Sequence, residues 1–208
     1  MRHATLAFGI ALALAACSGA GRAGDAAAFF NGRDLSGWQG RKDLWKVENG
    51  EIVGKAAPLS GYEYLVHSRP VKDFRLVLEV KLAGERGNGG LQFRSDMFET
   101  TDMKGLQADV GPGAWGKLIE RNGRGPLVET GAEEAVRPGD WNLYEILATG
   151  RRIQLALNGK KCADFADPQP DRPGLIGLQM AGDVDSFEIR FRNLSLETDP
   201  EPRLKTVR

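Results

Sequence analysis

The stretch FRLVLEVK at residues 74–81 decides the fold, because apolar side chains occupy every second position from Phe74 to Val80. Strict alternation of this kind is typical of a β-strand with one buried face. Residues 153–157 (IQLAL) repeat the pattern, and Asn158-Gly159 follows as a two-residue turn into residues 160–165. Asn-Gly between two alternating runs predicts a β-hairpin. The chain is therefore expected to form antiparallel sheets.

Further short apolar runs are separated by turn residues along most of the chain. They lie at residues 44–48, 51–53, 64–67, 90–94, 105–110, 115–120, 141–148, 174–179 and 187–194, the last with a bulge expected near Asn193. The 27 glycines among 208 residues follow no period, which favours many turns over a helical bundle. About a dozen strands and no long amphipathic helix predict an all-β fold, one sandwich of two antiparallel sheets over residues 29–198.

The charge balance excludes two classes of function. The 28 basic side chains are matched by 28 acidic ones. A near-neutral chain lacks the basic surface that nucleic-acid binding needs, and it also lacks the net charge of an acidic disordered protein. We therefore expect no nucleic-acid partner.

The N-terminal residues have the composition of a targeting signal. A short polar start is followed by an apolar run from Leu6 to Ala15, which is too short to span a bilayer. Leu14-Ala15-Ala16-Cys17 resembles the lipobox of bacterial lipoproteins. We predict a signal peptide at 1–16, a lipid anchor at Cys17 with a flexible tether to residue 28, and a periplasmic or outer-membrane location in the cell envelope.

Two assignments follow from the other end of the chain and from the second cysteine. If Cys17 carries lipid, Cys162 has no partner within the chain and is expected to be a buried strand residue. Residues 199–208 contain two prolines and no alternation, so we expect a flexible tail.

Alternation within three of the expected strands places polar side chains on one face of a sheet. The members of this face that carry chemistry or hydrogen-bonding groups are Gln92, Arg94, Gln107, Asp109 and either Lys117 or Glu120. If the strands are neighbours, they form a polar patch suited to sugar hydroxyls. The alternative is an ordinary solvated face of an antiparallel sheet.

Other candidates are single residues. His67 is the one histidine beyond the signal, and it is either a proton donor or ligand or a surface residue. Trp115, among small residues, is the best candidate for stacking on a sugar ring, whereas Trp45 and Trp141 are expected in the core. A divalent ion is possible, although no spacing requires one; its oxygen ligands would come from Glu99, Asp102, Asp109 and Glu120.

Several segments resemble, in order, the 3-keto-disaccharide hydrolase domain family. They are FNGRDLSGW at 30–38, WKVENGEI at 45–52, DFRL at 73–76, GNGGLQFR at 87–94, GDWN at 139–142, LNG at 157–159 and GLIGLQ at 174–179. The resemblance covers residues 29–197. It implies a concanavalin A-like jelly roll and cleavage of glycosides whose sugar carries a ketone at C3.

This chemistry needs a base, an oxyanion stabiliser and an acid. The resemblance implies Asp109 or Glu120 as base and acid, with Lys117 and Arg94 polarising the keto oxygen. Further substrate contacts are expected from Gln107, which would orient hydroxyls, and from Gln92, Trp115, Asn88 and His67. Many family members carry Glu at the position of Gln107, so the site is a variant in which another carboxylate is the base.

Two other functions stay open at this point. Glucanases of this fold use paired carboxylates in E-x-D-x-x-E, and residues 107–112 retain one of the three, which argues against ordinary retaining hydrolysis. A non-catalytic carbohydrate-binding module would use the same face without turnover, and a structural envelope lipoprotein would use neither. The glycoside, the anomer and the oligomeric state are not determined by the sequence.

Overall fold

The computed structural model describes residues 29–56, 61–84, 86–99, 101–181 and 186–207. The expected signal peptide, the lipidation site at Cys17 and the tether lie outside these residues. Within the described ranges, no helix has the length and apolar character that a membrane crossing requires. The described chain folds into fourteen strands and one short 3-10 helix, η1 (Glu133–Ala135).

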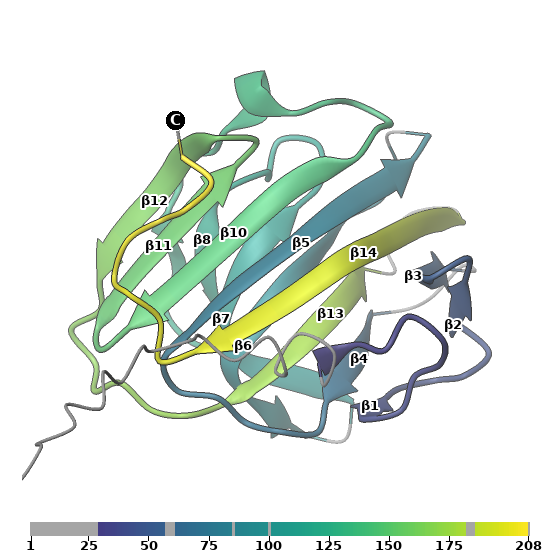
Figure 1. Cartoon of the computed structure of the whole chain (residues 1–208), viewed down its shortest axis with the longest axis horizontal. Coiled ribbons are helices and arrows are strands. Elements are labelled where there is room, and N and C mark those ends of the chain that lie inside the picture. The colour runs from purple at the N-terminus through teal and green to yellow at the C-terminus, as the bar shows by residue number, and fades with distance from the viewer. Residues whose placement is uncertain (1–28, 57–60, 85, 100, 182–185, 208) are drawn as a thin grey trace, which may run out of the picture.

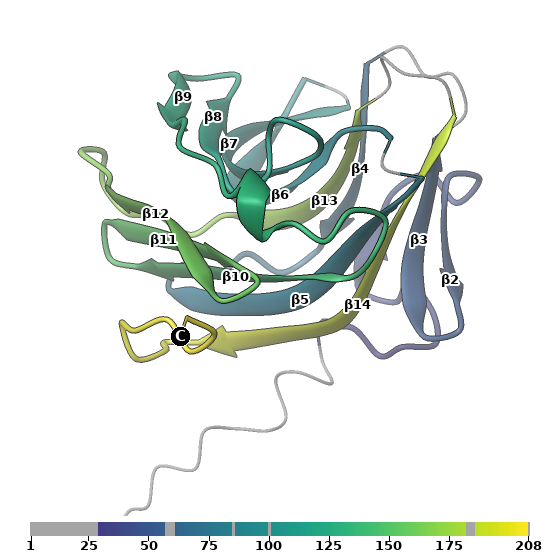
Figure 2. The same cartoon turned by 90° about the horizontal axis from the view of Figure 1, so that it is seen from above.

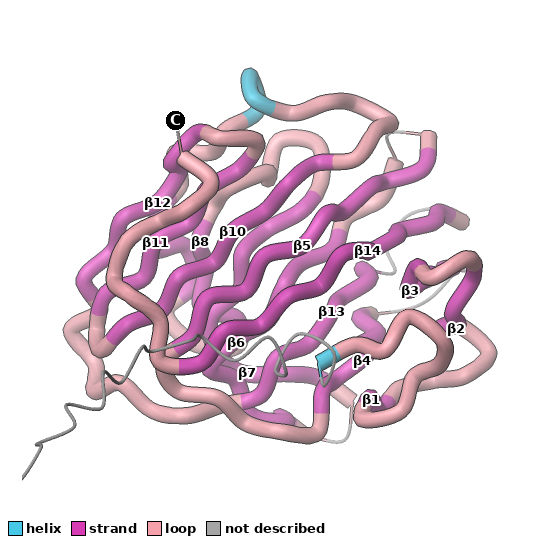
Figure 3. Tube along the Cα trace, in the orientation of Figure 1, coloured by secondary structure: helices cyan, strands magenta, loops and turns pink. Residues whose placement is uncertain are grey.

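The strands form two seven-stranded sheets that pack face to face (Figures 1 and 3). Sheet A has the order β1 (Trp38–Gln39), β4 (Tyr62–His67), β13 (Leu175–Ala181), β6 (Gly89–Phe98), β7 (Asp102–Val110), β8 (Leu118–Arg121), β9 (Gly125–Val128). Sheet B has the order β12 (Lys160–Ala166), β11 (Arg152–Leu157), β10 (Asn142–Thr149), β5 (Phe74–Ala83), β14 (Phe187–Thr198), β3 (Glu51–Ala56), β2 (Trp45–Glu48).

The predicted all-β sandwich of two antiparallel sheets is confirmed. The Asn158-Gly159 turn joins β11 to β12, and the register of β14 shifts between Arg192 and Ser195, around Asn193 with a φ of 54°. β1 and β9 are too short for an alternating pattern and were not expected. β8 begins at Leu118 rather than 115, because Ala114 and Trp115 donate backbone hydrogen bonds to Gly111 in a turn.

The core lies between the sheets and follows the alternation. Phe74, Leu76, Leu78 and Val80 of β5 are each at most 1% exposed. In sheet A the facing side chains form one cross-strand row over five strands, namely Leu65, Leu178, Leu91, Ala108 and Leu118. Burial of this row fixes the register of each strand, because a slip by one residue would turn its apolar side chains to solvent. The same register determines which side chains lie on the outer face of sheet A.

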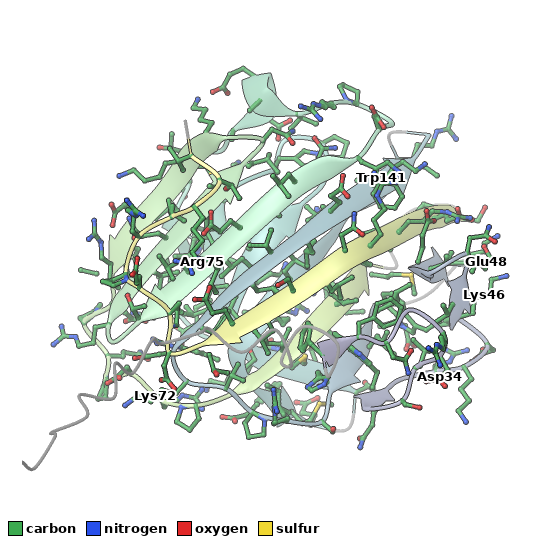
Figure 4. All side chains as sticks on the ribbon, in the orientation of Figure 1. Asp34, Lys46, Glu48, Lys72, Arg75 and Trp141 are labelled. Atoms are coloured by element: carbon green, nitrogen blue, oxygen red, sulfur yellow. The ribbon has the colours of Figure 1, made fainter. Side chains whose placement is uncertain are left out.

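The C-terminal segment differs from the expected flexible tail. After β14, residues 199–207 run along the outer face of sheet B, beside β10 and β11 (Figures 1 and 3). Their contacts centre on Glu145, which is fully buried and accepts hydrogen bonds from the backbone of Lys205 and Thr206. Arg75, labelled in Figure 4, pairs with Glu145 at 2.9 Å and donates to the Glu201 carbonyl at 2.8 Å. A buried ion pair thus holds the segment in place.

Candidate functional site

The outer face of sheet A carries a row of side chains across four neighbouring strands. Tyr64 on β4 lies opposite Gln179 on β13, which lies opposite Gly90 on β6, and Gly90 lies opposite Asp109 on β7. Lys117 continues the row, because its carbonyl accepts the Asp109 backbone N–H at 3.0 Å. Figure 2 shows that the sheet curves here, with β8 and β9 on one side and β4 on the other rising away from β6 and β13.

Asp109 has the environment of a general base near neutral pH. Asp109 is partly buried, and this burial raises the pKa of its carboxyl from 3.8 to about 6. A hydrogen bond from Gln107 Nε2 to Asp109 Oδ1, at 2.5 Å, and the nearby ammonium of Lys117 oppose this rise. Gly90, directly opposite, contributes no side chain, and the Gln107 side chain fills the space above it, where a Cβ would lie 2.6 Å from Gln107 Nε2.

A chain of amides fixes the orientation of Gln107. Gln92 donates from Nε2 to Gln107 Oε1 at 2.6 Å, and Ser95 Oγ donates to Gln92 Oε1 at 2.8 Å. With its oxygen occupied, Gln107 turns its nitrogen toward Asp109. All three residues are at most 2% exposed. Gln107 and Gln92 are therefore brought together as expected, but they hold Asp109 in position and have little surface to offer a sugar hydroxyl.

A second hydrogen-bonded group on this face was not expected from the sequence. Gln179 Nε2 donates to the Tyr64 hydroxyl at 2.8 Å, and that hydroxyl donates to Asp102 Oδ1 at 2.7 Å. Asp102 is also paired with Arg121 at 3.1 Å. Gln179 Oε1 is buried without a hydrogen-bond partner among the described residues. The signal available in the sequence was the position of Gln179, on the polar side of the alternating run 174–179.

Arg94 lies apart from this face, contrary to the expected alternation. The register of β6 shifts between Phe93 and Asp96, and Arg94 adopts a φ of 46°, which turns its side chain away from the Gln92 side. Its guanidinium donates to the Lys72 carbonyl at 3.0 Å, the Gly150 carbonyl at 2.7 Å and Asp73 Oδ1 at 2.9 Å. Arg94 therefore joins β6 to the loop before β5 and to the β10–β11 turn, and it does not lie on the Asp109 face of sheet A.

Glu120 also lies on the other side of the sheet. It shares its side of β8 with the core residue Leu118, and its carboxylate pairs with Arg124. Arg124 in turn pairs with Asp167 at 2.8 Å. Glu120 is therefore held in an ion-pair network away from the predicted patch. Asp109 is the carboxylate of that patch that lies beside Lys117.

The three remaining candidate residues lie in different parts of the fold. His67 is 5% exposed and packs against Phe29 and Trp38, with ring centroids 4.7 and 5.1 Å away, and burial lowers its pKa. Trp115 is 4% exposed and belongs to the core, so no ring face is available for a sugar. Asn88 lies beside Gly111, two residues beyond Asp109.

Two other tryptophans and the second cysteine occupy different environments. Trp45 is in the core as expected, at 1% exposed, and so is Cys162, whose thiol has a pKa raised to about 11 by burial. Trp141 differs: it lies on the outer face of sheet B (Figure 4), with Arg192 over its ring at 4.0 Å. It was expected in the core because its strand is apolar, but it precedes the strand.

The acidic residues considered as metal ligands do not gather. Within the described ranges, no three His, Cys, Asp or Glu side chains are arranged to hold a metal ion. Asp102 and Glu120 are each paired with an arginine. Asp102 is thus held in the group with Tyr64 and Arg121, and Asp109 beside Lys117 is the carboxylate of this face without an arginine partner among the described residues.

Comparison with known proteins agrees with the motifs and with the fold. The family model described as the 3-keto-alpha-glucoside-1,2-lyase-like domain matches residues 25–197, which confirms the resemblance found in the sequence. No curated protein matches the chain.

Among solved structures, a candidate glycosyl hydrolase from Parabacteroides distasonis is similar at a TM-score of 0.61 and 20% identity, covering 83% of this chain and 93% of that one. Carbohydrate binding module CBM66 from Bacillus subtilis matches at a TM-score of 0.58 and 19% identity, covering 78% and 96%. The VIP36 exoplasmic/lumenal domain, solved in a Ca²⁺/Man3GlcNAc-bound form, matches at 0.59 and 12%, covering 85% and 90%. These similarities establish the jelly-roll sandwich as the fold.

Proposed function

The chain belongs to the 3-keto-alpha-glucoside-1,2-lyase-like domain family, and we propose that it acts on carbohydrate by cleaving 3-keto-glycosides, with Asp109 as the base. The observation that carries this proposal is the partly buried carboxylate of Asp109, with a pKa of about 6, beside Lys117 and held by the hydrogen bond from Gln107. A base with a pKa near the working pH is suited to proton abstraction.

The ketone makes the reaction possible without a strong acid or a nucleophile. A C3 ketone acidifies the proton on C2, and Asp109 removes that proton. The electron pair of the C2–H bond forms an enolate with its negative charge on the C3 oxygen. The enolate then re-forms the ketone, a double bond forms between C1 and C2, and the C1–O bond breaks. The alkoxide that leaves takes up one proton and departs as an alcohol, so that one glycoside gives one enone and one alcohol.

Hydration completes an apparent hydrolysis. Addition of water across the C1–C2 double bond of the enone yields the free 3-keto sugar. Whether this step takes place on the protein decides between a lyase and a hydrolase. The same carboxyl group, protonated by the first step, is positioned to return its proton to the leaving alkoxide.

Lys117 is the cation that fits the developing enolate. It is the cross-strand neighbour of Asp109, and side chains opposite each other in an antiparallel pair lie about 5 Å apart at Cβ. A substrate whose C2 proton is at Asp109 would place its C3 oxygen two bonds away from C2, within reach of the ammonium. Gln107 keeps the carboxylate oriented through its hydrogen bond to Oδ1. Arg94 and Glu120 have no part in this assignment.

A non-catalytic carbohydrate-binding module is the second candidate, favoured by the similarity to CBM66. Such a module would bind sugars through the same face without turnover. The raised pKa of Asp109 gives no advantage to a binding protein, because the ionised carboxylate is the stronger hydrogen-bond acceptor. This difference favours the enzyme.

The test is to incubate the chain with a 3-keto-glucoside and with its unoxidised parent, with and without a chelator, and to follow products by mass spectrometry. The proposal expects release of the aglycone from the keto form alone, and loss of that release in Asp109→Asn. Glu120→Gln is the matched control, because it removes a carboxylate from the other side of the sheet. Saturable sugar binding without release from either compound would establish the binding module.

We also keep the proposal of a lipid anchor at Cys17 in the bacterial envelope. It depends on the lipobox resemblance alone. Radiolabelled palmitate incorporation that disappears in Cys17→Ser would support it, and unlabelled full-length protein would contradict it.

A further inference from the structure

A cavity of about 670 Å³ lies at the end of the sandwich where β1 is the last strand of sheet A and β2 the last strand of sheet B. Residues of β1, of β2 and of the loops on both sides of β1 line it. Asp109 is on β7, four strands from β1 in sheet A, which is about 19 Å at about 4.8 Å per strand. Figures 1 and 2 show β2 at one end of the molecule and β8, the neighbour of β7, at the other. The cavity is therefore separate from the Asp109 face.

The size and the wall of this cavity fit a small organic molecule rather than a bare ion. Small-molecule sites commonly have volumes of about 300–1,000 Å³, whereas one water molecule takes up about 30 Å³. Part of the wall is apolar and is formed by Leu35, Trp38, Val47 and Leu65. Charged groups from the two loops form much of the rest.

Two cations on the lining have no acidic partner. Arg33 and Lys42 are both exposed, and among the described residues no carboxylate lies within 4.0 Å of either charged group. Arg41, next to Lys42 in the chain, instead pairs with two carboxylates, at 2.6 and 3.0 Å. The charges of Arg33 and Lys42 are therefore available to a ligand in the cavity.

The acid on the lining, Asp34, is engaged by its own loop. Its Oδ1 accepts the backbone N–H of Ser36 at 2.9 Å and Nδ2 of Asn31 at 2.8 Å. Asn31 Oδ1 in turn accepts the backbone N–H of Arg33 at 2.8 Å, so these bonds also hold the backbone that carries the guanidinium. With two cations and one carboxylate, the lining keeps a positive charge and favours an anion.

Trp45 adds a buried hydrogen-bond donor. It lines the cavity and is 1% exposed. Cζ3 and Cη2 of its ring lie toward Gly54 on β3, where a Cβ would be 2.7 Å from Cζ3. Nε1 is on the opposite edge of the indole and is buried without a hydrogen-bond partner among the described residues, whereas Trp38 Nε1 donates to the Phe29 carbonyl at 2.9 Å. A buried donor without an acceptor is unfavourable, so a ligand oxygen that satisfies it gains binding energy.

We propose that this cavity binds an acidic sugar, a hexuronate unit whose carboxylate lies between Arg33 and Lys42 and whose ring lies along the apolar wall. The two cations supply charge-assisted hydrogen bonds to the carboxylate, and the Trp45 N–H is a donor to an oxygen of the sugar. The sugar follows from the carbohydrate-related family of the chain, and the acidic group follows from the charges of the lining. The site does not depend on the proposed function at Asp109, and either can fail without the other.

The experiment is isothermal titration calorimetry of the chain with glucuronate and galacturonate, with their neutral parents glucose and galactose, and with inorganic phosphate. At least one uronate should bind about tenfold or more tightly than its parent, and more weakly at high salt. Arg33→Gln and Lys42→Gln should each weaken that binding by about tenfold, the size of one hydrogen bond to a charged group. Lys46→Gln is the matched control, because Lys46 is an exposed lysine of β2 that pairs with Glu48 at 2.5 Å outside the lining. Both arginine and lysine positions are exposed, so the variants should fold.

A second measurement locates the ligand. The indole N–H signal of Trp45 in a proton–nitrogen correlation spectrum, assigned with Trp45→Phe, should shift when the uronate is added, while that of Trp141 on the outer face of sheet B stays in place. A Trp45 signal that does not move would overturn the site.

The other outcomes also decide. Absence of uronate binding, equal affinity for uronate and neutral parent, or binding unchanged in both glutamine variants would overturn the proposal. Phosphate that binds as tightly as the uronate would show a site for a bare anion and overturn the sugar. Asp109→Asn should bind the uronate as the wild type does, and a loss of binding there would place the uronate at Asp109 instead.

Discussion

Replacing Asp109 with asparagine should abolish turnover and, at the same time, stabilise the folded chain at neutral pH. Burial raises the pKa of this carboxyl from 3.8 to about 6. One pKa unit corresponds to about 1.4 kcal/mol, so ionisation is about 3 kcal/mol less favourable in the folded chain than in the unfolded one. The folded state binds the proton more tightly, and its stability therefore falls as the pH rises from 3.8 to 6.

The asparagine side chain in this variant carries no charge at any pH and can still accept the hydrogen bond from Gln107. The free energy of unfolding of Asp109→Asn should therefore equal that of the wild type below pH 4 and exceed it by up to about 3 kcal/mol above pH 6. Urea denaturation of both proteins at half-unit steps from pH 4 to pH 8 measures this difference. A difference that does not change with pH would refute the reasoning, because it would show that Asp109 titrates with an ordinary pKa.

Three further substitutions and one deletion test the roles assigned above. Lys117→Met should lower kcat by about 100-fold or more, because the enolate loses its stabilising cation. It should also move the acid limb of the pH–rate profile to higher pH, because the ammonium lowers the pKa of Asp109. An unchanged profile would contradict the position of Lys117 beside Asp109. Arg94→Met should reduce the free energy of unfolding by about 3 kcal/mol, measured by urea denaturation. Its kcat per folded molecule, measured with active-site titration, should stay within twofold of the wild type. A loss of kcat without a loss of stability would show that Arg94 acts in the catalytic site. Glu145→Ala should cost about 3 kcal/mol, because it removes one of the two carboxylates that pair with the buried guanidinium of Arg75 and leaves the Lys205 and Thr206 N–H groups without their acceptor. Deletion of residues 201–208 should cost less, about 1–3 kcal/mol, and equal urea midpoints for deletion and wild type would show that the segment is not held as described.

The fold was predictable because it depends on local alternation. The apolar positions of residues 74–81 and the Asn158-Gly159 turn determine strand faces and pairing in the immediate neighbourhood. The same reasoning correctly turned Gln107 and Asp109 away from the core. It failed at Arg94, because a bulge with a left-handed residue reverses the alternation, and no residue type in the sequence marks that position.

The candidate site was only partly predictable for a related reason. Contacts between distant strands, such as Tyr64 with Gln179 and Asp102, depend on the strand order of sheet A, which alternation does not determine. The ordered C-terminal segment was missed because its contacts are backbone N–H groups that bind one buried carboxylate, Glu145, and backbone hydrogen bonds have no sequence signature. Trp115 was expected at the surface because its neighbours are small, but the turn at 111–116 folds it into the core.

The most direct test of the central claim is the fate of the C2 proton. A methyl 3-keto-glucoside labelled with deuterium at C2 should be cleaved more slowly than the unlabelled compound, with a primary isotope effect on kcat/KM, and the released sugar should have lost the label to solvent. Asp109→Asn should neither cleave the substrate nor exchange the label. Cleavage that retains deuterium at C2 and shows no isotope effect would contradict elimination and would exclude Asp109 as its base.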